Sequence, residues 1–188
     1  MNKILEMNEI LSMNIDDNFE RVESFNKENC ITNNTKLIIV GTITPPGGRG
    51  YFYTAPRNRI YGYLDEYFGT KENGLKKLKS KLEGDTREGA IEQIKQYLVE
   101  REIAFLDVMK YAIRKKGSCA DKDIAYFSLD KESFGKINNA VIICNSRLAE
   151  ICYCEICEQL GLKNKHVFLS QRRATKEQWL QTLKEINL

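Results

Sequence analysis

Short, continuously apolar segments separated by helical segments are the feature that most limits the fold of this chain. The clearest examples are LIIV at 37–40 and AVIIC at 140–144, which are typical of strands buried on both faces of a sheet. Strands are predicted at 36–40, 103–108, 139–144 and 166–169. Because amphipathic helical segments lie between these strands, the pattern predicts an α/β fold. We expect a three-layer α/β/α sandwich around a central, mostly parallel four-stranded sheet.

The chain of 188 residues is expected to form one domain over residues 1–188, with residues 1–30 as an N-terminal helical extension. Helical spacing at the start of the extension places Ile4, Met7 and Leu11 on one face. A polar linker with a short helical piece is predicted to follow.

Two further segments have patterns that predict a loop and a helix. Residues 110–123 are rich in polar and charged side chains and are predicted to form a loop. The closing helix is predicted at 174–186, where Thr175 and Gln178 have the spacing of a capping box.

Charge and cysteine content restrict the compartment and the partners. The net charge of +3 is mild, so it permits an acidic partner without requiring one. The basic clusters at 76–81, 114–116 and 172–173 are either nucleic-acid contacts or solvated surface. We expect no membrane span, because no run of ~18 apolar residues is present. Six cysteines without a secretion signal predict reduced thiols in a cytoplasmic protein.

Three cysteines close together raise the question of a metal site. Cys152, Cys154 and Cys157 lie in a segment that is predicted to be helical. Positions 152 and 154 would lie about 200° apart around a helix, and no second CxxC pair completes a zinc site. We therefore interpret them as small packing residues and expect no metal. The lone histidine, His166, is expected to be structural.

Residues 37–69 combine a strand, a glycine turn, a loop and a helix start. The strand ends in Gly41, a Thr/Pro/Gly-rich loop leads to the aromatic cluster 51–53, and a polar tripeptide at 57–59 opens the helix. Open α/β folds bind ligands at the carboxyl ends of their strands, so a pocket is expected there. Aromatic rings beside an amide and two guanidinium groups suit a flat ligand with polar edges, such as a nucleobase.

Four segments, in order, resemble motifs of the uracil-DNA glycosylase superfamily. They are VGTITPPGGRGYFYTAPRNRIYGYL (40–64), AFLDVMKYAIRKKGSCADKDI (104–124), INNAVIICNSRLAEI (137–151) and HVFLSQRRATKEQWL (166–180). The second segment is similar to the hypoxanthine/uracil branch, which resembles DNA-deoxyinosine glycosylase. The resemblance spans roughly residues 36–186, which is nearly everything but the N-terminal extension.

The resemblance implies a monofunctional DNA repair enzyme. Such an enzyme hydrolyses the N-glycosidic bond of a deaminated base, uracil or hypoxanthine, after flipping it out of DNA. This chemistry needs no cofactor, and the resemblance implies DNA as the partner, with no membrane and no obligate protein partner. It also implies that Asn58, in the Pro-x-Asn segment, carries the catalytic role. Asn58 could instead cap the helix that begins near Ile60.

The same resemblance implies a set of base-binding residues. Tyr51 or Phe52 would stack on the base, although both rings could equally be core residues. Asn145 would read the base edge, because an amide can both donate and accept a hydrogen bond. Its alternative role is to cap a loop. Gly41 and Thr42 complete the set.

Contacts to the DNA strand are implied at two places. Arg57 and Arg59 would grip phosphates, or would only solvate the helix start. The DNA-inserting loop of the last motif corresponds to Ser170, Gln171, Arg172 and Arg173. A serine in this loop can bind a phosphate, and an arginine can enter the gap left by the flipped base.

Two motifs depart from the superfamily. Thr42 stands where other branches have Asp or Asn, and a threonine cannot act as a base at neutral pH. The loop at 170–175 also lacks the usual prolines. A catalytically inactive module that binds nucleic acid or a nucleotide on the same fold is therefore an alternative, and an enzyme for a nucleotide-like small molecule is a third. Basic residues gathered around the pocket mouth would favour DNA.

Overall fold

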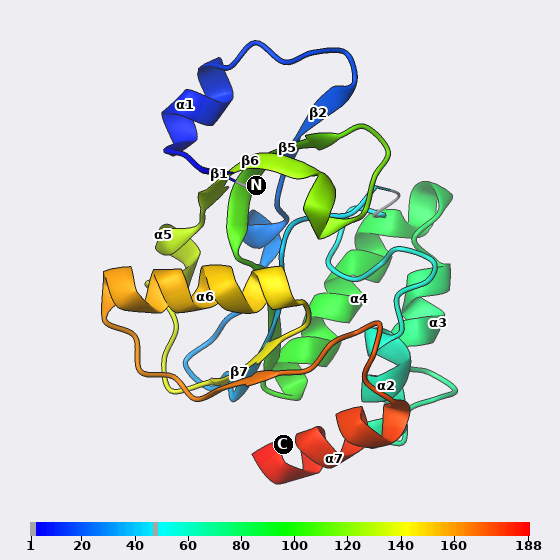
Figure 1. Ribbon diagram of the computed structural model, residues 1–188. Helices are drawn as coiled ribbons and strands as arrows, with labels where there is room; N and C mark the ends of the chain where they lie inside the picture. Colours follow the sequence, from blue (N-terminus) through cyan, green and yellow to red (C-terminus); the bar gives the residue numbers. More distant parts are fainter. Residues whose placement is uncertain (1–2, 47–48) are drawn as a thin grey trace.

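The computed structural model describes residues 3–46 and 49–188 and contains two four-stranded sheets flanked by helices (Figure 1). The strands are β1 (Lys3–Ile4), β2 (Phe19–Glu23), β3 (Leu37–Gly41), β4 (Ile103–Asp107), β5 (Met109–Lys115), β6 (Ile124–Leu129), β7 (Val141–Cys144) and β8 (His166–Phe168). The helices are α1 (Met7–Ser12), α2 (Ile60–Tyr67), α3 (Leu75–Ser80), α4 (Arg87–Glu100), α5 (Lys131–Phe134), α6 (Arg147–Leu160) and α7 (Lys176–Ile186).

One sheet has the strand order β4-β3-β7-β8, and all its neighbouring strands are parallel. In its register, Ile39 of β3 pairs with Phe105 of β4 and with Ile143 of β7. Every residue of β3 and β4 is buried, as expected for strands covered on both faces. The predicted fold class is therefore confirmed, and each of the four predicted strands is found within about two residues of its expected ends.

The two faces of the parallel sheet are covered by different elements. Ile39 and Phe105 pack in the core formed with α2, α3, α4 and α7. Val40 and Leu106, the next residues along each strand, pack with α5, α6 and the second sheet. Side chains alternate between faces along a strand, so residues two positions apart lie on the same face. This rule also assigns the residues at the strand ends to one face or the other.

The second sheet was not predicted from the sequence. Its order is β1-β6-β5-β2, and β5 is antiparallel to both β6 and β2. The predicted loop at 110–123 is wrong over its first half, which forms β5. The short helical piece expected in the linker is likewise a strand, β2.

A buried arginine accounts for the difference between the predicted loop and strand β5. Arg114 is 5% exposed, although it is charged. Its Nε lies 2.8 Å from Oε1 of Glu20 on β2, and its Nη1 donates to the carbonyl of Thr44. A charge that is neutralised by a partner distant in sequence has no signature in the local hydrophobic pattern.

The N-terminal segment differs from the expected helical extension. The helix α1 has six residues, and its buried side chain is Ile10. Ile4, Met7 and Leu11, which were expected to share an apolar face, are exposed. Strands β1 and β2 join this segment to the second sheet, while the division of the chain into domains stays a prediction.

The closing helix α7 begins as expected. Thr175 and Gln178 form the predicted capping box, in which Thr175 Oγ1 accepts from the Gln178 N–H and Gln178 Oε1 accepts from the Thr175 N–H. Trp179 of α7 stacks on Tyr63 of α2 at a centroid distance of 5.6 Å. None of the helices in the described ranges is long and apolar enough to cross a membrane.

Candidate active site

The carboxyl ends of three neighbouring parallel strands bring Gly41, Asp107 and Asn145 into one row. Gly41 of β3 pairs with Asp107 of β4 in the sheet register. The Asn145 N–H donates to the carbonyl of Val40 at 2.9 Å, which continues β7 alongside β3. By strand alternation, all three residues belong to the face covered by α2 and α7. Gly41 occupies the middle of the row.

Gly41 leaves space that a neighbouring carboxylate uses. A Cβ at this position would lie 2.5 Å from Oδ1 of Asp107 and 3.2 Å from the hydroxyl of Tyr53. The first distance is shorter than a normal Cβ contact, so any side chain at position 41 would force the Asp107 carboxylate to move. Tyr53 is itself unusual, since its φ of 56° is in the left-handed region. Its hydroxyl donates to the carbonyl of Ile39 at 3.3 Å.

The Asp107 carboxylate is buried and has no hydrogen bond to a described residue. The residue is only 5% exposed. Burial, followed by the nearby charge of Asp130, raises the pKa of Asp107 from 3.8 to about 7. Asn26 binds the Asp107 backbone at both its N–H (2.8 Å) and its carbonyl (2.7 Å), and donates to Oδ2 of Asp130 at 2.6 Å. The backbone is therefore fixed while the carboxylate stays unpartnered.

Asn145 is 9% exposed and links the row to the last loop. Its side-chain amide makes no hydrogen bond within the described ranges. Its backbone carbonyl accepts from the Gln171 N–H at 3.1 Å. The amide thus keeps both a donor and an acceptor for a ligand, whereas the alternative role of loop cap is filled by the backbone.

The loop at 170–173 forms a turn at this edge of the sheet. Oγ of Ser170 accepts from the Arg173 N–H at 3.2 Å. Arg172 reaches the carbonyl of Cys119 at 3.4 Å, which joins this loop to the one after β5. Both arginines are exposed, and neither forms an ion pair with another described residue. Four of the predicted DNA-binding residues therefore lie beside Asn145.

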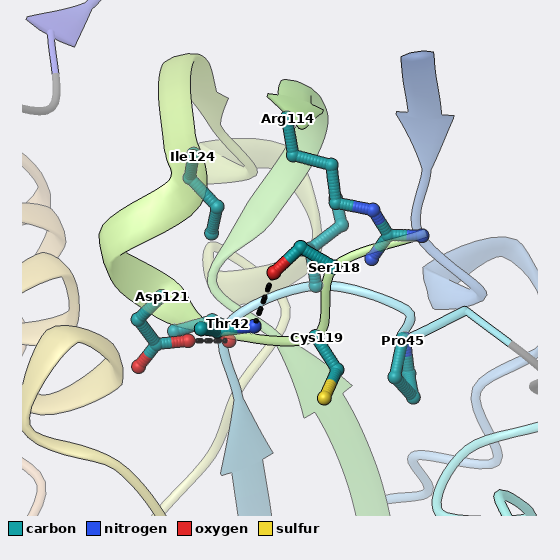
Figure 2. A pocket seen from close by; sticks show the side chains of 9 residues that line it. Thr42, Pro45, Arg114, Ser118, Cys119, Asp121 and Ile124 are labelled. Atoms are coloured by element: carbon teal, nitrogen blue, oxygen red, sulfur yellow. Dashed lines mark hydrogen bonds between the residues drawn. The ribbon is translucent and has the colours of Figure 1, made fainter. Parts of the chain in front are cut away.

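Thr42 lies next to Gly41 but lines a different pocket (Figure 2). Its hydroxyl donates to Oδ1 of Asp121 at 3.0 Å. Arg114 and Ser118 also line this pocket, which has a volume of about 20 Å³. That volume holds about one water molecule, so it cannot accept a base. In this structure Thr42 faces the second sheet rather than the row.

The aromatic rings expected to stack on a base occupy core positions. Tyr51 is 1% exposed and Phe52 is 2% exposed. The two rings pack edge to face at 5.2 Å, and Phe52 also contacts the ring of Phe25 at 6.0 Å. Stacking of a base by either ring would require this loop to open.

Asn58 is half-buried at the start of α2. Its Oδ1 accepts from the Ile60 N–H at 3.0 Å, although the N-cap residue of α2 is Arg59 and not Asn58. Its Nδ2 makes no hydrogen bond to a described residue. No contact between described residues links Asn58 to the row at Gly41, and Arg57 and Arg59 beside it are exposed without ion pairs.

A buried lysine holds the loop that carries Asn58. Lys79 of α3 is 9% exposed, and burial lowers its pKa. Its ammonium donates to the carbonyls of Ala55 at 2.6 Å, Asn58 at 3.3 Å and Pro56 at 3.5 Å. The loop is therefore fixed through its backbone carbonyls.

Sequence reasoning assigned no role to Asp107 or Lys79. A signal for Asp107 was present, since an acidic residue that directly follows a buried strand lies at the same sheet edge as Gly41. Lys79 gave no such signal, because it belongs to the basic cluster at 76–81 and resembles its solvated neighbours.

Comparison with known structures agrees with this architecture. The chain is similar to the solution NMR structure of a putative uracil DNA glycosylase from Methanosarcina acetivorans, with a TM-score of 0.55 and 16% sequence identity. The match covers 90% of this chain and 99% of that one. At this identity the likeness shows the fold, which is uracil-DNA-glycosylase-like α/β/α. No protein-family model and no curated protein sequence matches the chain.

Proposed function

We propose that the chain is a DNA glycosylase that hydrolyses the N-glycosidic bond of a deaminated base, uracil or hypoxanthine, flipped out of DNA. One observation carries the proposal. Among the described residues, the Asn145 amide has no hydrogen-bond partner, and it lies at the carboxyl edge of the sheet beside a glycine and a loop with two exposed arginines. The similarity to a uracil-DNA-glycosylase-like fold supports it.

Base recognition follows from the chemistry of the amide. Uracil and hypoxanthine each present a donor and an acceptor on one edge, and the free Asn145 amide offers the complementary pair. Arg172 and Arg173 would bind the strand from which the base is extracted, since guanidinium groups bind phosphate and enter grooves. Arg57 and Arg59 are further candidates for phosphate contacts.

Asn58 is the proposed catalytic amide. Its Oδ1 is engaged by the Ile60 N–H, so the amide plane is fixed and Nδ2 is left to donate. A fixed donor of this kind orients the attacking water or stabilises the charge of the departing base. Stacking by Tyr51 or Phe52 joins this scheme only if the loop that carries them opens on DNA.

A gel assay on labelled duplexes tests the proposal. Each duplex holds a single uracil, hypoxanthine or xanthine, and alkali cleaves the abasic site that base release leaves. The expected result is cleavage at one lesion, with the single-turnover rate lowered about 100-fold or more in Asn58→Ala and DNA affinity nearly unchanged.

One variant separates catalysis from the hydrogen bond that Asn58 makes to the Ile60 N–H. Asn58→Asp keeps an oxygen acceptor for the Ile60 N–H but removes the amide donor, so it is expected to fold normally and to lose activity. Asn14→Ala, at an exposed asparagine with no described side-chain hydrogen bond, is the matched control and should retain the full rate. If the rate of base release is unchanged in both Asn58→Ala and Asn58→Asp, Asn58 is not the catalytic residue.

A nucleic-acid-binding module without catalysis is the second candidate function. The burial of Tyr51 and Phe52 favours it, because neither ring is open to a base in this structure. It predicts that the chain binds duplex DNA in a salt-sensitive manner and releases no base from any of the three lesions.

A further inference from the structure

The Asp107 carboxylate makes no hydrogen bond or ion pair that would stabilise the fold in the described part of the chain. It is more than nine-tenths buried, and it makes no hydrogen bond to any described residue. The side-chain atoms that are fully sealed from solvent without a partner, among the described residues, are those of Thr44, Tyr153 and Trp179. The oxygens of Asp107 are not among these sealed atoms.

The surrounding structure fixes the position of this carboxylate. Asn26 holds the Asp107 backbone through two hydrogen bonds, and Gly41 provides the gap into which Oδ1 projects. Asp130, which Asn26 also contacts, is fully engaged, since its oxygens accept from Asn26 Nδ2 and from both the N–H and the hydroxyl of Ser133. Of these two neighbouring buried carboxylates, Asp130 caps helix α5, whereas Asp107 has no hydrogen-bond partner among the described residues.

We propose that Asp107 is the general base of the reaction, accepting a proton from the water that attacks the sugar. The inference rests on the proposed function and adds a residue that this function did not include. It also accounts for a departure noted in the sequence, because β4 then supplies the carboxylate that the loop after Gly41 lacks at Thr42. Asp107 and Asn145 follow the strands on either side of β3, so the base reader and the proton acceptor lie at the same edge of the sheet.

In the reaction step, one bond forms at C1′ as another breaks. The water oxygen forms a bond to C1′ of the nucleotide as the C1′–N bond breaks, and the departing base takes the bonding electron pair. The water proton passes to the Asp107 carboxylate. The carboxylic acid then releases this proton to solvent, and the base anion takes up a proton from solvent, which restores the enzyme and leaves an abasic site.

This role requires the ionised carboxylate, which sets a pH dependence. The titratable groups that face Asp107 are Asp130, whose negative charge opposes ionisation, and Tyr53, whose hydroxyl stays protonated because burial raises its pKa well above the usual value. Asp107 ionises at about pH 7, so the single-turnover rate should rise as the pH passes through that value.

The experiment measures single-turnover base release from pH 5 to pH 9, on the lesion duplex that the wild-type chain cleaves. Three forms are compared: wild type, Asp107→Asn and Asp130→Asn. Asp107→Asn should lower the rate about 100-fold or more and abolish the rise near pH 7, with DNA affinity unchanged within about twofold. Asp130→Asn should keep the rate at pH 9 and shift the midpoint to lower pH, because a like charge is removed.

Each outcome is decisive. A wild-type enzyme that cleaves, with Asp107→Asn cleaving equally well, overturns the role of Asp107 and leaves the proposed function intact. A wild-type chain that releases no base from any lesion overturns the proposed function and this inference together. If Asp107→Asn failed to fold, the other two profiles would decide, since a midpoint that does not move in Asp130→Asn contradicts the inference.

Discussion

At the scale of single residues, the site depends on Gly41, which leaves room for the carboxylate of Asp107 on the neighbouring strand. Gly41 and Asp107 are register partners on neighbouring strands, and Oδ1 of Asp107 occupies the volume that a Cβ at 41 would fill. Because both strands are buried along their whole length, neither backbone can move away to relieve a clash.

The first prediction concerns this close approach. Gly41→Ala places a methyl group 2.5 Å from Oδ1 of Asp107, so the carboxylate must be displaced. We expect a loss of about 1–3 kcal/mol in the free energy of unfolding, together with loss of base release. Chemical denaturation and the duplex assay measure the two effects. Gly62→Ala on α2, where an added Cβ meets no atom within 4 Å, is the matched control and should be neutral or stabilising.

The second prediction is the effect of Asp107 on stability. The pKa of the Asp107 carboxyl is raised to about 7 in the folded chain. The folded chain therefore keeps this proton until the pH approaches 7, whereas the unfolded chain releases it near pH 4. Stability contributed by the protonated form therefore declines as the pH rises from about 4 to about 7. Asp107→Asn removes this loss and should raise the unfolding free energy at pH 8 by a few kcal/mol, about 4 at most.

Thermal unfolding at pH 5 and pH 8 measures this difference. The gain in Asp107→Asn should be larger at pH 8 than at pH 5. A variant that is less stable than wild type at pH 8 would show that the carboxylate makes a structural bond, and would remove the main reason to regard it as functional.

At the scale of elements, the loop before α2 is held by hydrogen bonds from the buried ammonium group of Lys79. The ammonium of Lys79 satisfies three loop carbonyls, so α3 positions the residue that opens α2. The third prediction is that Lys79→Met lowers stability by about 1–3 kcal/mol and lowers the turnover rate without changing DNA affinity, because the loop carrying Asn58 loses its anchor. Hydrogen exchange at 55–60 should become faster.

A control lies on the same helix. Lys77 is exposed, and its ammonium donates only to the side chain of Asn73 among the described residues. Lys77→Met should therefore leave stability and turnover close to wild type. Equal behaviour of the two variants would mean that Lys79 has no special role in positioning Asn58.

The elements also show how far the sequence determines the structure. Strands β3 and β4 were predictable, because both are fully buried and continuously apolar. Strand β5 was not, since its buried Arg114 is neutralised by Glu20, which lies 94 positions away in the sequence. In the site, the positions of Gly41 and Asn145 followed from the strand ends. The burial of Tyr51 and Phe52 did not, because an aromatic cluster in a loop has the same sequence signature whether it packs inward or faces a ligand.

At the scale of the whole molecule, exposed cations that form no ion pair with another described residue lie beside Asn145, at the carboxyl edge of the parallel sheet. Arg172 and Arg173 are exposed beside Asn145, and Arg172 contacts the loop after β5, near the exposed Lys115 and Lys116. Many other cations are paired, for example Lys36 with Glu102 at 2.5 Å and Lys95 with Glu28 at 2.6 Å. An edge with unpaired positive charge suits the phosphate backbone of DNA.

The fourth prediction follows from this distribution. Replacing Arg172 and Arg173 together by alanine should weaken duplex binding and reduce the slope of log affinity against log salt by about 2, because two phosphate contacts are lost. Fluorescence anisotropy between low and moderate salt measures the slope. Lys163 and Lys165 precede β8, at the opposite edge of the sheet, so their double alanine variant should leave the slope unchanged. Equal slopes in the two double variants would mean that DNA does not contact Arg172 and Arg173.

The most direct measurement is base release by the wild-type chain from duplexes that carry one uracil or one hypoxanthine, followed under single-turnover conditions. We predict strand cleavage after alkali at one of these lesions, with a rate that rises as the pH passes through about 7. Binding of the same duplexes at every pH, with no abasic site formed, would contradict the account and leave a binding module on a glycosylase-like fold.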